Sequence, residues 1–167
     1  MSKITAAVAL ALAVLAASPL AVSAAGLKAN IYMTQNKIPN GLTEKGLLGF
    51  VKSHNAKILR ESTEEKLEER KFMAEMVVQF SSPPNDAEFH VKFFDIHDGP
   101  RKYIEDLPVY IMDKKQKVYL QRVKLPRTRF KPNRRMELVA TVKGGEVGSL
   151  KFGVEGEEKR NSGVVSF

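Results

Sequence analysis

The residues with the clearest chemical potential in this sequence are cations. Ten basic residues lie between Asp113 and Arg135, and Asp113 is the only acid in that window. Lysine binds anionic groups as a point charge, and arginine can bind a phosphate or carboxylate through two parallel hydrogen bonds. The window therefore predicts a polyanion-binding surface, which we call the basic run. Its candidate residues are Arg122, Lys124, Arg127, Arg129, Lys131, Arg134 and Arg135.

The spacing of the basic run allows two interpretations. Arg122 and Lys124 share one face of a predicted strand, and Arg127, Arg129 and Lys131 are predicted to alternate along the next extended piece. Cations repeating at about 6.5–7 Å would suit an anionic polymer or a lipid surface. In the alternative, the same side chains are solvated outer faces or pair with the acidic segment between Glu61 and Glu69, where surface pairs contribute about 0–1 kcal/mol each. Nucleic acid is not favoured, because Tyr119 and Phe130 are the only aromatic residues in the window.

Motifs for catalysis are missing from the sequence. The chain has no cysteine, no Gly-x-Ser-x-Gly nucleophile motif and no phosphate-binding Gly-rich loop that ends in Lys-Ser or Lys-Thr. We therefore expect a protein that is not an enzyme and that needs no cofactor. A small hydrolase with two carboxylates stays open as an alternative, because such chemistry leaves no short motif.

One loop has oxygen ligands that could suit a calcium ion. Asp95, His97 and Asp98 come together just before Gly99, but the regular acids of a twelve-residue calcium loop are absent. The simpler interpretation is a turn, in which Asp95 accepts hydrogen bonds from backbone N–H groups. We expect no metal here, and His90 is expected at the surface of its strand.

The elements that position these residues are predicted to be strands. Apolar residues alternate with polar ones in several segments that are separated by Pro- and Gly-containing turns, with Lys143-Gly144-Gly145-Glu146 as a tight hairpin. The segments are 29–34, 72–80, 88–93, 107–111, 118–125, 136–142, 150–154 and a last short one at 164–167. This density of short strands predicts an all-β protein, an antiparallel β-sandwich of immunoglobulin-like type.

Residues 43–71 break the strand pattern and predict a short helix or an irregular segment. Leu47, Phe50 and Val51 have helical spacing, but Gly46 and Gly49 each weaken a helix by about 1 kcal/mol relative to alanine. Helix and strand therefore both stay open at 43–60. Ser62 followed by Glu65 fits a helix capping box, with an exposed charged loop as the alternative for 62–71.

The N-terminus predicts export. Lys3 precedes an apolar run rich in Ala, Val and Leu, and small residues follow at 21–26, as in a bacterial secretory signal that is cleaved after Ala24 or Ala25. Residues 1–25 are thus expected to be a signal peptide and residues 26–167 a single β-sandwich domain, with no transmembrane segment in the mature chain. The formal charge of +8 would fall to +7 on loss of Lys3.

These observations together predict a periplasmic or extracellular binding module. Its expected partner is an anionic polymer or lipid of the bacterial envelope, held by the basic run. A structural or assembly module that meets another envelope protein through a sheet edge is the first alternative. The carboxylate-based hydrolase is the second.

Overall fold

The computed structural model describes residues 26–64 and 66–157. Their elements are β1 (Ala29–Thr34), α1 (Glu44–Ser53), β2 (Ile58–Arg60), β3 (Lys71–Phe80), β4 (Glu88–Asp95), β5 (Lys102–Tyr110), β6 (Val118–Pro126), β7 (Arg134–Val142) and β8 (Gly145–Glu155). The predicted signal peptide at 1–25 and the predicted last strand at 164–167 lie outside these residues and remain predictions.

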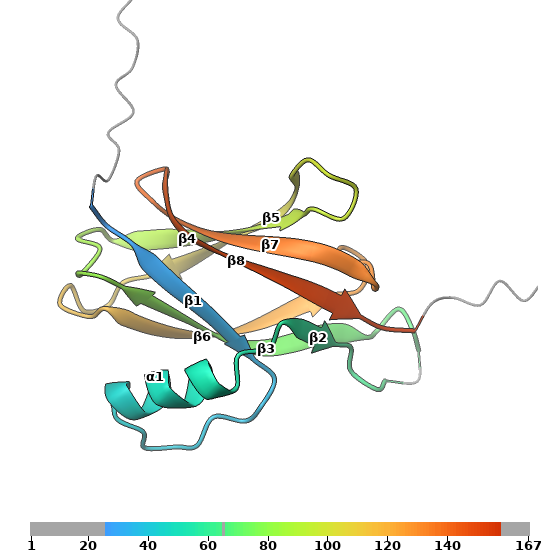
Figure 1. Ribbon diagram of the computed structural model, residues 1–167, viewed down its shortest axis with the longest axis horizontal. Helices are drawn as coiled ribbons and strands as arrows, with labels where there is room; N and C mark the ends of the chain where they lie inside the picture. The colour runs from blue at the N-terminus through green and yellow to red at the C-terminus, as the bar shows by residue number, and fades with distance from the viewer. Residues whose placement is uncertain (1–25, 65, 158–167) are drawn as a thin grey trace, which may run out of the picture.

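The strands form two facing sheets, in the orders β1-β3-β6 and β2-β8-β7-β4-β5 (Figure 1). The chain crosses from one sheet to the other at five connections: β1 to β2, β2 to β3, β3 to β4, β5 to β6 and β6 to β7. These crossings and strand orders give an immunoglobulin-like β-sandwich, as the alternating segments predicted. Every pair is antiparallel except β2 with β8, which is parallel. Strand β2 could not be predicted from the sequence, because a strand of three residues is too short to show a period.

The core lies between the two sheets and is built from the inward side chains of each strand. On β3, Phe72, Met76 and Phe80 are almost completely buried, with Ala74 and Val78 between them. Phe130 is fully buried and meets Phe93 edge to face, with ring centroids 5.5 Å apart.

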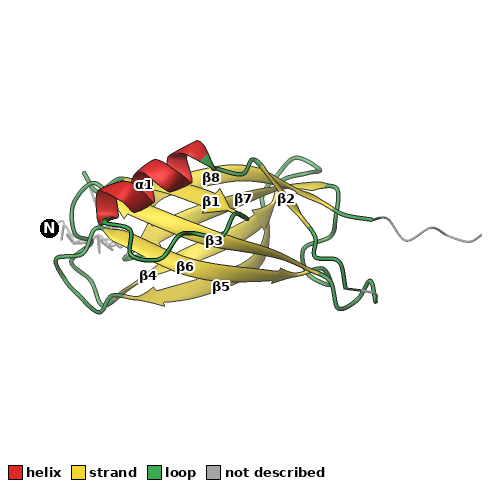
Figure 2. Ribbon diagram, turned by 90° about the horizontal axis from the view of Figure 1, so that it is seen from below, coloured by secondary structure: helices red, strands yellow, loops and turns green. Residues whose placement is uncertain are grey.

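Helix α1 covers the outer face of the three-stranded sheet (Figures 1 and 2). Thr43 caps its first turn, since the Thr43 hydroxyl accepts a hydrogen bond from the N–H of Gly46 at 3.2 Å. Val51 packs with Val77 of β3 and Val118 of β6 in a small apolar cluster, and all three are buried. The structure therefore resolves the open choice at residues 43–60 in favour of a helix followed by β2.

One choice that the sequence left open is resolved, and one local prediction is wrong. Residues 62–64 and 66–70 form the charged loop, the alternative to a helix, with one turn at 66–69, and the Ser62 hydroxyl accepts a hydrogen bond from the N–H of Lys71 as β3 begins. Residues 127–130 form a turn rather than an extended piece, because the N–H groups of Arg129 and Phe130 both donate to the carbonyl of Pro126. The predicted hairpin between β7 and β8 is confirmed, with positive φ at Lys143 and Gly144.

Candidate anion-binding pocket

Gly153 creates a hollow in the outer face of the five-stranded sheet. Phe152 and Val154 on either side of it point into the core, so Gly153 faces outward on β8. Its neighbours across the sheet are Arg135 on β7 and Ile58 on β2. Because glycine has no side chain, the sheet surface is open between these two residues.

A pocket of about 740 Å³ occupies this hollow. Its floor comes from β2, β7 and β8, and its wall from the loop between β4 and β5, which contributes Ile96, Gly99 and Arg101. Four cationic residues line it, but only one acid. The cations are Lys57, Arg101, Arg135 and Lys151, and the acid is Glu137.

Arg101 neutralises the one carboxylate of the pocket. Its guanidinium donates two hydrogen bonds to Glu137, at 2.7 and 3.2 Å, and a third to Glu146 at 2.7 Å. Hydrogen bonding to Glu137 and Glu146 raises the pKa of Arg101 above its ordinary value. The guanidinium also lies over the ring of Phe94, 5.5 Å from its centroid. Glu137 is only 4% exposed. Because Arg101 binds its carboxylate, the negative charge of Glu137 is compensated without a ligand.

Three cations remain to act on a ligand: Lys57, Arg135 and Lys151. All three are exposed, and Lys151 lies two residues from Gly153 on the same outward face. The carbonyl of Lys57 accepts a hydrogen bond from the N–H of Gly153 at 2.8 Å, which holds the backbone of Lys57 at the rim of the pocket. One guanidinium nitrogen of Arg135 donates to the carbonyl of His97 at 3.3 Å. This arrangement can hold a phosphate, sulfate or carboxylate group, with Ile58 and Ile96 as an apolar flank.

The structure divides the basic run between the two outer faces of the sandwich and one of its ends. Arg122 and Lys124 lie on the outer face of the three-stranded sheet, where Arg122 donates to Glu75 at 2.7 Å. Arg135 lies on the outer face of the opposite sheet, at the pocket. The basic run therefore does not form one continuous row, and of its seven residues only Arg135 lines the pocket.

Arg127 belongs to a buried ion network at one end of the sandwich. Its guanidinium pairs with Glu61, and the two side chains are only 9% and 8% exposed. Arg70 donates to the same carboxylate at 3.0 Å, as does the N–H of Glu157 at 2.7 Å. Burial opposes the charge of Glu61, but hydrogen bonds from Glu157, Arg70 and Arg127 outweigh it and hold the pKa of Glu61 below its ordinary value. Arg127 thus has a structural role.

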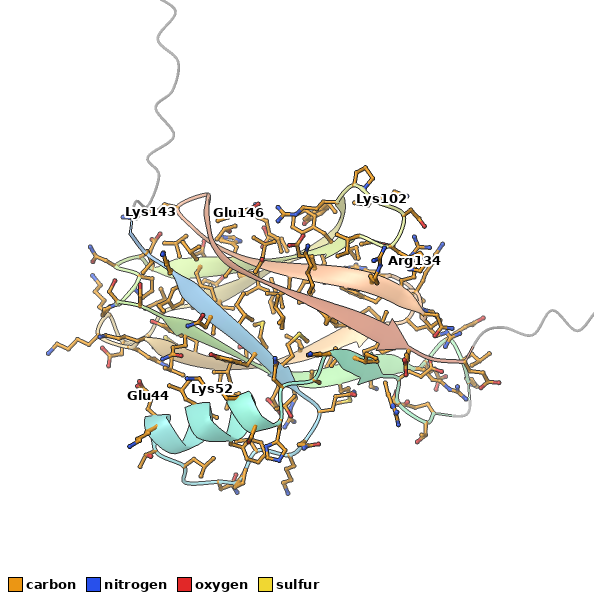
Figure 3. The ribbon with its side chains drawn as sticks, viewed as in Figure 1. Glu44, Lys52, Lys102, Arg134, Lys143 and Glu146 are labelled. Atoms are coloured by element: carbon orange, nitrogen blue, oxygen red, sulfur yellow. The ribbon has the colours of Figure 1, made fainter. Side chains whose placement is uncertain are left out.

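The other predicted cations also have defined places. Arg129 pairs with Glu105 at 3.0 Å and Lys131 is exposed beside the same turn. Arg134 binds both Asp95, at 2.6 Å, and Asp98, close to Lys102 at the start of β5 (Figure 3).

The loop at Asp95 has the geometry of the predicted turn. Asp95 accepts a hydrogen bond from the N–H of His97 at 2.8 Å, and Asp98 accepts one from Lys102 at 3.3 Å. Both carboxylates are thus already engaged by cations and by the backbone. Among the described residues, no group of three or more His, Cys, Asp or Glu side chains is placed to hold a metal ion.

Lys57, Arg101 and Lys151 were missed as candidate site residues. The alternation of Lys151 with Gly153 in a predicted strand was a usable signal, because it places a cation beside an open position of the same face. Lys57 and Arg101 come from other segments, and only the pairing of β2 with β8 and the fold of the β4–β5 loop bring them to the pocket.

Comparisons with known proteins bear on the fold. No family model matches the sequence, and no curated protein matches it. Among solved structures, the chain is similar to an immunoglobulin-like protein from Pseudomonas aeruginosa, with 14% sequence identity over 78% of this chain and 98% of that one and a TM-score of 0.41. The assignment of the fold rests on the strand order described above. None of the helices formed by the described residues is long and apolar enough to cross a membrane.

Proposed function

We propose that this protein is a non-catalytic binding module that holds an anionic group in the pocket at Gly153. The observation that carries the proposal is the convergence of Lys57, Arg135 and Lys151 on a hollow whose own carboxylate is already bound by Arg101. A phosphate or sulfate group would face three cations without competition from Glu137. Charge-assisted hydrogen bonds of this kind contribute about 1.5–3 kcal/mol each.

The expected ligand is an anionic polymer or a lipid head group. The pocket is open enough to take a group that projects from a larger molecule, and Ile58, which is 47% exposed, offers apolar contact beside it. Export to the bacterial envelope, predicted from residues 1–25, would bring the protein to such ligands. The other cations of the basic run would then add long-range attraction, since the net charge is positive.

Hydrolysis has less support than binding. A carboxylate-based hydrolase needs two carboxyl groups across the substrate, one of them free to act as a base or nucleophile. Glu137 is the one acid that lines the pocket, and its carboxylate accepts two hydrogen bonds from Arg101.

The test compares two double variants with the same change in charge. Arg135→Gln with Lys151→Gln alters the pocket, whereas Lys124→Gln with Lys131→Gln alters exposed cations elsewhere. Binding is measured to a fluorescent heparin oligosaccharide and, separately, to phosphatidylglycerol vesicles, across a salt series. These two arms distinguish a polymer from a lipid surface.

We expect the pocket variant to lose affinity by about tenfold or more in one arm, and the control variant by about twofold or less. The affinity of both variants should fall as the salt concentration rises, because screening acts over about 8–10 Å at physiological ionic strength. Equal losses in the two variants would show that net charge alone is responsible and would overturn the assignment of the pocket. Absence of binding in both arms would overturn the proposed ligand chemistry.

A further inference from the structure

Strand β6 forms the edge of the three-stranded sheet, on the face opposite the anion-binding pocket. The N–H of Phe80 donates a hydrogen bond to the carbonyl of Lys117, which sets the hydrogen-bonding register between β3 and β6. In an antiparallel pair, every second residue has its N–H and C=O groups directed away from the partner strand. On β6 these are residues 118, 120, 122 and 124. Two of those carbonyls accept a hydrogen bond from a side-chain amide instead. The Gln116 amide donates to the carbonyl of Val118 at 2.6 Å, and the Gln121 amide donates to the carbonyl of Arg122 at 3.3 Å. Such an edge is a template for a further extended segment.

A pocket with a partly apolar lining lies directly beside this edge. It has a volume of about 370 Å³ and lies between the segment that precedes α1 and the outer face of β3 and β6. Its apolar lining comes from Ile38, Pro39, Leu42, Leu47 and Leu120. Leu42 and Leu120 are 40% and 47% exposed, because α1 covers Val77 and Val118 but leaves the next outward residue of β6 uncovered.

The charge of this surface favours an acidic partner. Within β6 the ionisable side chains are Tyr119, Arg122 and Lys124, so the strand has no acid. The pocket is lined by two cations, Lys37 and Arg122, and by one acid, Glu75. A second copy that paired its own β6 here would bring Arg122 and Lys124 against the same cations, and like charges on neighbouring strands are destabilising. Glu75 compensates only Arg122, whose side chain stays 64% exposed.

We propose that β6 is a docking edge for an extended segment of another protein, one that carries acidic residues and a large apolar side chain. The segment adds a strand to the sheet through the outward backbone groups of Leu120 to Lys124. Its apolar side chain enters the pocket at Leu42 and Leu120, and its carboxylates face Arg122 and Lys124. This site and the anion-binding pocket lie on different sheets, so either can exist without the other.

The experiment uses a nine-residue peptide in which Glu and Val alternate around a central Leu, with a Lys-for-Glu peptide as its control. Binding to the protein is followed by amide chemical shifts. Lys124→Pro removes one outward N–H without removing a ladder bond to β3, and Lys124→Thr is its match, with the same loss of charge but the N–H retained. Leu120→Ser removes the apolar contact and leaves the backbone intact.

We expect saturable shifts at residues 120–124 and at Leu42 with the acidic peptide. Lys124→Pro should bind it about tenfold more weakly than Lys124→Thr, and Leu120→Ser about tenfold more weakly than the unmodified protein. Shifts confined to the pocket at Gly153, equal binding of the Lys peptide, or no difference among the variants would overturn the proposal. Concentration-dependent self-association that Lys124→Pro abolishes would also overturn it, in favour of a second copy as the occupant.

Discussion

Neighbouring cations of the basic run differ chiefly in burial. Arg127 and Glu61 form a pair whose side chains are less than one-tenth exposed, whereas Arg129 is 60% exposed where it meets Glu105. Removing one partner of a buried pair leaves the other charge desolvated, which costs about 3–5 kcal/mol. An exposed pair contributes about 0–1 kcal/mol.

We therefore expect Arg127→Gln to lower the free energy of unfolding by about 3 kcal/mol. The matched change Arg129→Gln should lower it by less than about 1 kcal/mol. Urea unfolding of the two variants, followed by circular dichroism, measures both values. Equal destabilisation would contradict the structural role of the Glu61–Arg127 pair and would show that Arg127 behaves like an exposed cation.

At the scale of elements, β1 closes one side of the sandwich by passing against β8 (Figure 1). The contact depends on Gly148, because a Cβ atom there would lie 2.2 Å from the carbonyl oxygen of Ala29. At Gly153 on the same strand, the nearest atom to a Cβ would be 3.5 Å away, which is an ordinary contact. Gly148 and Gly153 therefore serve different purposes, close packing at Gly148 and an open pocket at Gly153.

Gly148→Ala should destabilise the protein by about 1–3 kcal/mol, because the backbone of β1 must move to admit the methyl group. Gly153→Ala should change stability by less than about 1 kcal/mol. Thermal unfolding of both variants measures the difference. A Gly148→Ala protein as stable as the Gly153→Ala protein would show that β1 is not held tightly against β8.

The elements also show what the sequence could predict. Period-two alternation is local, so the long strands and the hairpin at Lys143 were predictable from their own residues. Helix α1 was not, because Gly46 and Gly49 weaken it locally and the burial of Val51 against β3 and β6 decides its structure. The anion-binding pocket was least predictable: Arg135 was expected to bind, but Lys57 and Arg101 reach the pocket only through the pairing of distant strands.

For the molecule as a whole, its ion pairs set the pH range of stability. Hydrogen bonds from Arg134, and to a lesser extent from Lys102, hold the pKa of Asp98 below its ordinary value. The pKa of Glu61 is also below its ordinary value. The pKa of His90 is raised instead, because its hydrogen bond with Asp106, at 3.0 Å, and its contact with Glu88 outweigh the effect of burial. The first two groups stabilise the fold when ionised, and His90 stabilises it when protonated.

These three groups predict that stability is greatest between about pH 4.5 and 6.5, the ordinary pKa values of Glu and His. A carboxylate with a lowered pKa contributes fully above its unfolded value, and the contribution is lost as the pH falls through the folded pKa. A histidine with a raised pKa contributes fully below its unfolded value, and the contribution is lost as the pH rises through the folded pKa. Urea unfolding from about pH 3 to about pH 8, which extends about one and a half units beyond each of these values, should show both losses. His90→Gln should remove the loss above pH 6.5 and leave the acid loss unchanged, and an identical decline above pH 6.5 in that variant would assign it to another group.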